Sequence, residues 1–214
     1  MCGITGFVSK NIINYKDVLN TMISKMNHRG PDSNGIYYNA DFKIGLGHAR
    51  LSIVDLSESG HQPMASTLGR YHMVFNGEIY NHIAIREKLN KEYQIKWKGT
   101  SDTETVLIAI EKWGIDKTIK QLVGMFAIAL VDEEEQKLYL IRDRMGEKPL
   151  YYGWVNEDFV FASDIKSIST FPFFQNQINR NSLALFLKHS AIPEPYSIYE
   201  NIFKLEVGTI ATLD

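Results

Sequence analysis

The segment GMFAIALVD, at residues 124–132, places the strongest constraint on what this chain can fold into. Its central residues FAIALV are apolar at every position, so a strand built from them carries apolar side chains on both faces. Such a strand is stable only where both of its faces are covered. KLYLIRDR follows after the charged turn EEEQ, and the two segments together predict a hairpin. This hairpin therefore belongs in the interior of a layered structure.

Other short apolar segments predict further strands at ITGFVS (4–9), GLGHARLSIVDL (45–56), YHMVF (71–75), PLYYGWV (149–155) and DFVFAS (158–163). Helical periodicity predicts helices over about 15–27, over 82–90 and from Ser101 to Trp113, where Ser101 and Glu104 have capping-box spacing and Gly114 closes the helix. HRGPDSNG, at 28–35, is rich in turn residues and predicts a loop. Many antiparallel strands with a few helices indicate an α+β fold in which two sheets lie between helices.

The chain changes character after about residue 171. The segment FPFFQNQINRNSLALFLKHSAIPEPYSIYENIF contains three of the six prolines and predicts one helix followed by an irregular stretch. We place a domain boundary within 170–195.

Charge and cysteine content narrow the classes of function. Lys and Arg total 23 and Asp and Glu total 25, so the net charge is −2 and no basic excess indicates nucleic acid. A single cysteine excludes an internal disulfide and favours a reducing, cytoplasmic compartment. We expect no signal peptide and no membrane partner, since no apolar segment reaches about 18 residues. We also expect no metal site, because metal-binding spacing is absent from His28, His48, His61, His72, His82 and His189.

The only cysteine, Cys2, directly follows the initiator methionine. Aminopeptidases remove Met1 when the second residue is small, which leaves Cys2 with a free α-amine beside its thiol. An α-amine has a pKa of roughly 7.7–8.0, so it can serve as general base for a thiol with a pKa of about 8.5. Cys2 is therefore a candidate nucleophile that needs no histidine. The alternative is a small buried residue near the start of a strand.

A cysteine that attacks an amide needs hydrogen-bond donors for the oxyanion that forms. VFNGEIYNH supplies two candidates, the side-chain amide of Asn76 and the backbone N–H of Gly77. The alternative is strong, because Asn-Gly between apolar segments is also the best short-range signal for a hairpin turn.

An amino-acid substrate needs contacts of both signs. Arg50 can bind a carboxylate with its two-pronged guanidinium, and Asp102 or Glu78 can hold an α-ammonium. Each residue also has an ordinary interpretation. Arg50 alternates with apolar neighbours as in any half-buried strand, and acidic residues are common near the start of a helix.

The joint pattern is more specific than any single residue. Seven segments, in order, resemble the N-terminal glutaminase domain of glutamine-dependent asparagine synthetases: MCGITGF, NHRGPDSNG, GHARLSIVDLSESGHQPM, FNGEIYNH, SDTETVL, GMFAIALVD and RDRMGEKPLYYG. These are class II, or N-terminal-nucleophile, glutamine amidotransferases. The resemblance runs from residue 1 to about 170 and is weaker in AIPEPYSIYENIFKLEVGT. It implies an Ntn-hydrolase fold, a four-layer αββα sandwich of two antiparallel sheets. It further implies a class II glutaminase domain over 1–180 and a linker or the start of a synthetase domain over 181–214.

The resemblance also implies a role for each matching residue. Cys2 is the nucleophile with its α-amine as base, and Asn76 and Gly77 form the oxyanion hole. Arg50 binds the glutamine carboxylate, Leu51 and Ile53 help to line the pocket, and Glu78 and Asp102 hold the α-amino group. We interpret the loop with Arg29, Gly30 and Asp32 as scaffold or lid. Arg142, Asp143 and Arg144 are interpreted as structural, facing a second domain.

The family's partner domain is expected to lie C-terminal in the same full-length chain. That domain activates aspartate with ATP and Mg²⁺, and its SGGxDS loop is absent here, as is GxxxxGK(S/T). We therefore interpret the chain as a fragment of a longer synthetase-like protein, with a free-standing glutaminase subunit as the lesser possibility. L-glutamine is the expected substrate, and no cofactor is expected in this domain. A homodimer stays one option, since nothing in these residues sets the oligomeric state.

Three alternatives stay open. The first is an N-terminal-nucleophile hydrolase for another amide, which would not need Arg50 and Asp102 together. The second is a non-catalytic domain that has kept the fold. The third keeps the glutaminase chemistry and changes the acceptor to another carboxylate, such as a sugar acid in surface polysaccharide.

Overall fold

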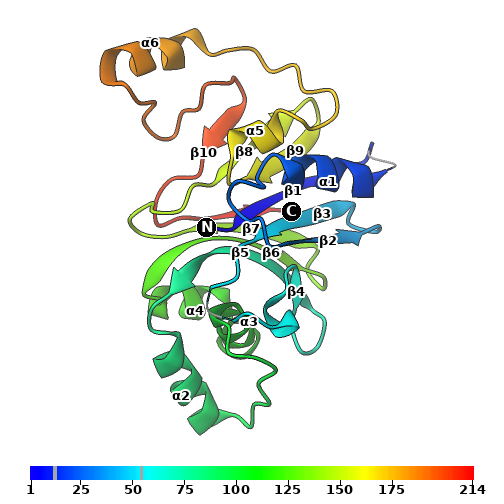
Figure 1. Ribbon diagram of the computed structural model, residues 1–214, viewed down its shortest axis with the longest axis vertical. Coiled ribbons are helices and arrows are strands. Elements are labelled where there is room, and N and C mark those ends of the chain that lie inside the picture. The colour runs from blue at the N-terminus through cyan, green and yellow to red at the C-terminus, as the bar shows by residue number, and fades with distance from the viewer. Residues whose placement is uncertain (12–13, 54) are drawn as a thin grey trace.

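The computed structural model describes residues 1–11, 14–53 and 55–214 (Figure 1). The predicted strand over 45–56 includes Val54, which lies outside the described residues. The strands are β1 (Gly3–Val8), β2 (Ser33–Asn39), β3 (Ile44–Arg50), β4 (Met64–Ala65), β5 (Tyr71–Ile79), β6 (Gly124–Asp132), β7 (Lys137–Arg142), β8 (Tyr151–Val155), β9 (Asp158–Ala162), β10 (Ile202–Lys204) and β11 (Ile210–Leu213). The helices are α1 (Tyr15–Ser24), α2 (His82–Glu92), α3 (Asp102–Trp113), α4 (Ile115–Gln121), α5 (Ile165–Ile168) and α6 (Arg180–His189), with a short 3₁₀ helix η1 (Glu58–Gly60).

The strands form two antiparallel sheets. The first has the order β10-β8-β9-β1-β3-β2 and the second has the order β11-β7-β6-β5-β4. Helices α1 and α5 pack on the outer face of the first sheet, and α3, backed by α2 and α4, packs on the outer face of the second (Figure 1). The predicted α+β sandwich of two antiparallel sheets between helices is therefore confirmed.

Apolar side chains hold these four layers together. Between the sheets, Ile4, Leu46 and Phe161 meet Val74 and Leu140. The outer face of β5 and β6 packs on α3 through Phe75 and Ile128, among others. The central strand β6 is buried from Phe126 to Asp132, so the doubly apolar segment lies inside, as predicted.

The strand β5 continues through Asn76 and Gly77, so the hairpin turn that Asn-Gly indicated is wrong. Asn76 pairs with Ala127 and Gly77 pairs with Phe126 on β6. Antiparallel pairing over nine residues outweighs the local turn preference here.

Two other boundaries differ from the sequence predictions. HRGPDSNG is a loop only at its start. Its last three residues belong to β2, which begins at Ser33, opposite Arg50 at the end of β3. The strand predicted over 45–56 ends at Arg50, where the chain leaves the sheet and forms the edge of a pocket. The two hairpins β6–β7 and β8–β9 are confirmed.

The segment after residue 180 contributes to both sheets. β10 pairs with β8 and β11 pairs with β7, while α6 extends beyond the sandwich next to β10 (Figure 1). The boundary near residue 180 stays a prediction. Arg142 links this segment to the rest of the fold by donating hydrogen bonds to Glu194 Oε1 at 2.6 Å and to the Lys148 carbonyl at 2.8 Å.

Candidate active site

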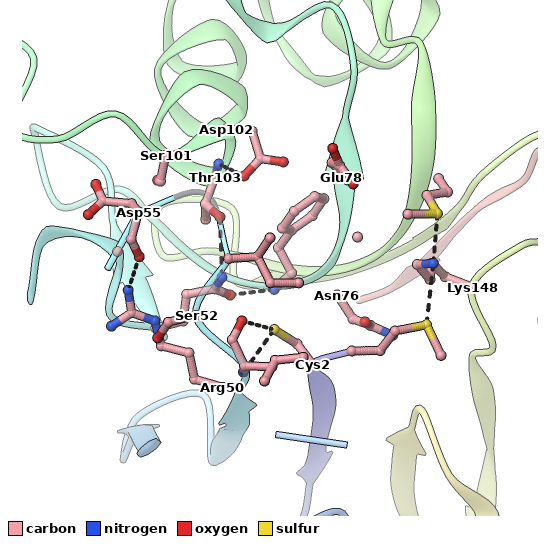
Figure 2. A pocket seen from close by; sticks show the side chains of 18 residues that line it. Cys2, Arg50, Ser52, Asp55, Asn76, Glu78, Ser101, Asp102, Thr103 and Lys148 are labelled. Atoms are coloured by element: carbon pink, nitrogen blue, oxygen red, sulfur yellow. Dashed lines mark hydrogen bonds between the residues drawn. The ribbon is translucent and has the colours of Figure 1, made fainter. Parts of the chain in front are cut away.

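One pocket, a cavity of about 90 Å³, contains all the site residues that the sequence indicated. Arg50 lies on one side of it, Lys148 lies on the other, and Cys2 and Asn76 lie between them (Figure 2). The predicted residues in its lining are Cys2, Arg50, Leu51, Ile53, Asn76, Gly77, Glu78 and Asp102. Ten others were not named as site residues: Met1, Ser52, Asp55, Gly60, Gln62, Phe75, Ser101, Thr103, Met125 and Lys148.

Cys2 lies immediately before β1, where the chain enters the first sheet. Its sulfur is 3.4 Å from the backbone N–H of Leu51, which donates to it, and 3.5 Å from the carbonyl of Leu51. Burial raises the pKa of the Cys2 thiol. The sulfur therefore stays protonated near neutral pH unless a base beside it takes the proton.

The RGPDS loop holds the nucleophile from behind. Arg29 donates through Nε to the carbonyl of Cys2 at 3.0 Å, and Asp32 accepts from the N–H of Ser52 at 2.8 Å. A Cβ on Gly30 would lie 2.2 Å from the carbonyl oxygen of Ala49, so only glycine fits this close approach. The loop thus contacts the backbone around Cys2 and the end of β3, as expected for the scaffold role.

The ladder between β5 and β6 decides where the N–H of Gly77 points. Its partner Phe126 donates to Asp143 Oδ2 at 3.1 Å and accepts from the Asp143 N–H at 2.9 Å, so the polar backbone groups of Phe126 face away from β5. Gly77 and Phe126 are therefore a non-hydrogen-bonded pair. By the alternation of an antiparallel ladder, the N–H of Gly77 points away from β6.

Two neighbouring N–H groups on that same edge of β5 already have acceptors. Phe75 donates to Gln62 Oε1 at 2.6 Å, and Ile79 donates to Asp102 Oδ2 at 2.9 Å. Gly77 lies between them and lines the pocket. A Cβ at this position would lie 2.2 Å from the carbonyl oxygen of Met125. Glycine thus allows the close approach of β5 to β6 at this point, while the ladder directs its N–H away from β6.

Asn76 is buried and its amide is only partly satisfied. Its Nδ2 is 3.4 Å from Ser163 Oγ, and its Oδ1 has no hydrogen-bond partner within the described part of the chain. A buried amide oxygen without a partner is uncommon in a folded protein. This side chain and Cys2 both line the pocket (Figure 2).

Arg50 is 8% exposed, and its guanidinium extends from β3 toward the loop that follows (Figure 2). Its Nη2 donates to the carbonyls of Asp55 at 2.6 Å and Ser57 at 3.0 Å. A Cβ on Gly60 would lie 2.5 Å from this nitrogen, so the loop backbone packs directly on the guanidinium. This anchoring holds a fixed positive charge in the pocket wall. The solvent-facing interpretation of Arg50 is wrong, since it assumed that β3 has one exposed face.

Leu51 and Ile53 lie on the segment that leaves β3. Leu51 is half-buried against Cys2, while Ile53 is 68% exposed at the rim of the pocket.

Asp102 begins α3 inside the protein. Its Oδ2 accepts from the N–H of Ile79 and its Oδ1 accepts from the N–H of Thr103, each at 2.9 Å. Burial raises the pKa of the Asp102 carboxyl, against the effect of these hydrogen bonds. Glu78 also lines the pocket, from β5, and is exposed. The pocket therefore carries acidic groups on the side formed by α3 and β5.

A second arginine fixes the loop that leads into α3. Arg86 donates to the carbonyls of Gly99 at 2.9 Å and Ser101 at 2.8 Å, and its guanidinium lies 4.0 Å from the ring centre of Trp97. Ser101 caps the helix by accepting from the N–H of Glu104 at 3.1 Å. The Glu104 carboxylate accepts from the N–H of Lys98 and of Gly99, so the capping box forms only in its first half.

Asp55 was not named as a site residue, although it lies in the DLSES run close to Arg50. Its carboxylate accepts from Ser57 Oγ at 2.6 Å and from the N–H of Thr100 at 2.9 Å. The hydrogen bond from Ser57 is the largest of the effects that lower the pKa of Asp55 to about 2. This carboxylate joins the loop after β3 to the loop before α3.

Lys148 was likewise missed, although the segment KPLYYG had been noted. It is buried, with Nζ 2.8 Å from Met125 Sδ and 3.5 Å from Met1 Sδ. Among the described residues, no cluster of His, Cys, Asp and Glu could hold a metal ion, and no helix is long and apolar enough to span a membrane.

Comparison with known proteins places this geometry in a family. The family model described as "Glutamine amidotransferase domain" matches residues 1–214. A protein of Methanocaldococcus jannaschii, provisionally named a glutamine-hydrolysing asparagine synthetase, is 40% identical over 96% of this chain and 42% of its own length. Asparagine synthetase (glutamine-hydrolysing) 1 of Bacillus subtilis is 36% identical over the whole of this chain and 33% of its own length. The chain thus spans less than half the length of these relatives.

A solved structure shares the fold at low identity. Glutamine phosphoribosylpyrophosphate amidotransferase from B. subtilis, in complex with ADP and GMP, superposes with a TM-score of 0.68 at 19% identity, over 79% of this chain and 43% of that one. The family match over the full length and the sandwich architecture agree with each other. The chain therefore belongs to the glutamine amidotransferase domain family, with an Ntn-hydrolase fold and with glutamine-hydrolysing asparagine synthetases among its relatives.

Proposed function

We propose that this domain hydrolyses L-glutamine to glutamate and ammonia through a thioester on Cys2. One observation carries the proposal: the Cys2 sulfur, the edge N–H of Gly77, the fixed Arg50 guanidinium and the Asp102 carboxylate line the same pocket. That set provides a nucleophile, an oxyanion donor and charges of both signs for an amino-acid substrate. A hydrolase for some other amide would not need the last two together.

Removal of Met1 completes the site in this account. It frees the α-amine of Cys2 and takes away a side chain that lines the pocket beside Lys148. Because burial keeps the thiol protonated, the α-amine is the base that takes its proton, directly or through one water. Arg29 holds the Cys2 carbonyl and thereby fixes the geometry of amine and thiol.

The reaction then follows two steps. The sulfur attacks the side-chain carbonyl carbon of glutamine, and the oxygen that becomes negative accepts from the N–H of Gly77 and from the amide of Asn76. The C–N bond breaks, and the α-ammonium gives its proton to the departing ammonia. Water, deprotonated by the same amine, attacks the thioester and releases glutamate and the free Cys2 thiol.

The substrate is oriented by groups distant from the sulfur. Arg50 pairs with the α-carboxylate, while Asp102 and Glu78 hold the α-ammonium from the α3 and β5 side. Leu51 supports the substrate chain and contacts the sulfur, and Ile53 covers the rim.

We further propose that the ammonia serves an ATP-dependent amidation in a C-terminal synthetase domain of a longer chain. Two relatives support this. Each is more than twice as long as the part that matches this chain, and both are named as glutamine-hydrolysing asparagine synthetases. ATP and Mg²⁺ would act there, with aspartate as the acceptor. A sugar acid in surface polysaccharide is the second candidate acceptor. A cytoplasmic location and a homodimer stay predictions.

Assays of Cys2→Ala and Cys2→Ser in the full natural chain test the hydrolysis. Glutamate release from glutamine should vanish in both variants, since alanine has no nucleophile and serine has a much weaker one. Lys188→Ala, on the exposed end of α6, is the control and should keep full activity. Activity that survives in Cys2→Ala would refute the mechanism. A wild-type chain without Met1 that never hydrolyses glutamine would favour a non-catalytic domain.

A further inference from the structure

The buried amide of Asn76 has its two ends in unequal surroundings. Oδ1 has no hydrogen-bond partner in the described part of the chain, while Nδ2 faces the oxygen of Ser163 at a long 3.4 Å. Ser163 lies just beyond β9 and is 2% exposed. The contact therefore joins β5 of the second sheet to the end of β9 in the first.

Ser163 is held rigidly against β1. Its Oγ accepts from the N–H of Ile4 at 3.1 Å, and its own N–H donates to the carbonyl of Ile4 at 2.8 Å. Ile4 is two residues beyond Cys2 on the strand that carries the nucleophile. Ser163 thus connects the strand of the nucleophile to the side chain expected to stabilise the oxyanion.

The hydrogens around Ser163 Oγ favour one orientation of the amide. A hydroxyl has one hydrogen to donate and two lone pairs, and one lone pair already accepts from Ile4. Its hydrogen is therefore best used by an acceptor, and the unpartnered acceptor beside it is Asn76 Oδ1. A half-turn of the carboxamide lets the hydroxyl donate to Oδ1 and moves Nδ2 to the unpartnered position that Oδ1 now holds, where both of its hydrogens are free to donate.

We propose that Ser163 is a positioning residue that turns the Asn76 carboxamide, so that Nδ2 joins the N–H of Gly77 as an oxyanion donor. The inference rests on the proposed glutaminase function and adds the residue that orients one half of the oxyanion hole. Ser163 touches no substrate in this account. It acts only through Asn76.

The test is Ser163→Ala in the full natural chain, assayed for glutamine hydrolysis. Losing a whole oxyanion donor typically costs about 10²–10³ in rate, and losing only its orientation should cost less, so we expect kcat to fall about 10-fold. The KM for glutamine should stay within about twofold, because the contacts to the two charged ends are unchanged. Ser163→Cys, of nearly the same shape but with a weak donor, should give an intermediate kcat.

Ser167→Ala is the matched control. Ser167 is fully buried nearby, and its Oγ donates to Thr5 Oγ1 at 3.1 Å rather than to the Asn76 amide. This variant should keep the wild-type kcat. If Ser163→Ala does not fold, the kcat of Ser163→Cys is compared with that of Ser167→Ala instead.

A double-mutant cycle separates positioning from general support of the fold. In an Asn76→Ala background, Ser163→Ala should change kcat less than twofold, since no carboxamide is left to orient. The inference is overturned if Ser163→Ala matches the control, if it raises KM alone, or if its effect is undiminished in the Asn76→Ala background. Absence of hydrolysis in the processed wild type would instead refute the proposed function.

Discussion

Arg50 is a buried cation that forms no ion pair among the described residues, although its charge also helps to lower the pKa of the nearby Asp55 carboxyl. Its Nη2 is held by two loop carbonyls, which leaves donors elsewhere on the guanidinium for a ligand. A buried charge is stable only when it is well compensated, so an incoming carboxylate gains from it. Residues that bind the substrate and residues that act in the reaction should therefore differ in their kinetic effects. Loss of a binding residue should mainly change KM, and loss of a reacting residue should mainly change kcat.

Arg50→Ala should mainly raise the KM for glutamine. A hydrogen-bonded charge pair contributes about 1.5–3 kcal/mol, which corresponds to a rise of roughly 10- to 100-fold. The contact is made equally in the ground and transition states, so kcat should change only a few-fold. Steady-state glutaminase assays measure both constants, with Arg50→Lys as the variant that keeps the charge and loses the fork. A large loss of kcat at unchanged KM would remove Arg50 from this role.

Asn76→Ala should show the opposite pattern. An oxyanion donor acts in the transition state, so kcat should fall about 10²-fold while KM stays within a few-fold. The same assay measures both constants, and circular dichroism confirms that the variant folds. A change confined to KM would contradict the oxyanion assignment.

His48 should make the free energy of unfolding depend on pH. Complete burial lowers the pKa of His48 to about 3, and its Nε2 lies 3.2 Å from the carbonyl of Phe75. Below about pH 6.5 the unfolded chain binds a proton at this residue and the folded chain does not, so stability falls as the pH falls. Between pH 7 and pH 5 the loss should be about 2 kcal/mol.

Urea unfolding at both pH values measures this loss, and His48→Gln should reduce it. The exposed His189 provides the control, because His189→Gln should leave the pH dependence unchanged. The Asp55 carboxyl has a pKa of about 2, so its contribution is lost at much lower pH. An identical pH dependence in His48→Gln and wild type would contradict the assignment.

Among the elements, the start of α3 connects helix stability to the pocket. Ser101 caps the helix whose first residue is Asp102, and both residues line the pocket. Arg86 and Glu104 fix the preceding loop through backbone contacts. The position of the carboxylate proposed to bind the α-ammonium therefore depends on how well this helix end is ordered.

Ser101→Ala should lower the free energy of unfolding by about 1 kcal/mol and also raise the KM for glutamine. Asn179→Ala is the matched control, because Asn179 caps α6 by accepting from the N–H of Ser182 at 3.0 Å, away from the pocket. It should lose similar stability with no change in KM. Equal KM values in the two variants would show that the α3 cap does not position Asp102.

The elements also show what local sequence can and cannot predict. The interior hairpin of β6 and β7 is predictable because a strand with two apolar faces needs cover on both. The hairpin turn indicated at Asn76 and Gly77 is wrong because pairing with β6 decides their conformation. The short strands β10 and β11, of three and four residues, carry little periodicity and exist through pairing with β8 and β7.

At the scale of the whole molecule, the site draws on both sheets. Cys2 and Arg50 come from β1, β3 and their ends in the first sheet, while Asn76 and Gly77 come from β5 in the second. The sequence alone could name these residues, because each lies in a recognisable motif. It could not find Gln62 or Ser163, which contact Phe75 and Asn76 across separations of 13 and 87 residues in the chain.

A processed Cys2 in a glutamine-shaped pocket should react with a glutamine analogue. The most direct measurement is the intact mass of the protein before and after exposure to a glutamine analogue with a diazo-ketone group. We expect a starting mass without Met1 and the gain of one adduct, which excess glutamine suppresses and Cys2→Ala abolishes. A protein that lacks Met1 and gains no adduct, or whose adduct forms equally in excess glutamine, would contradict the claim.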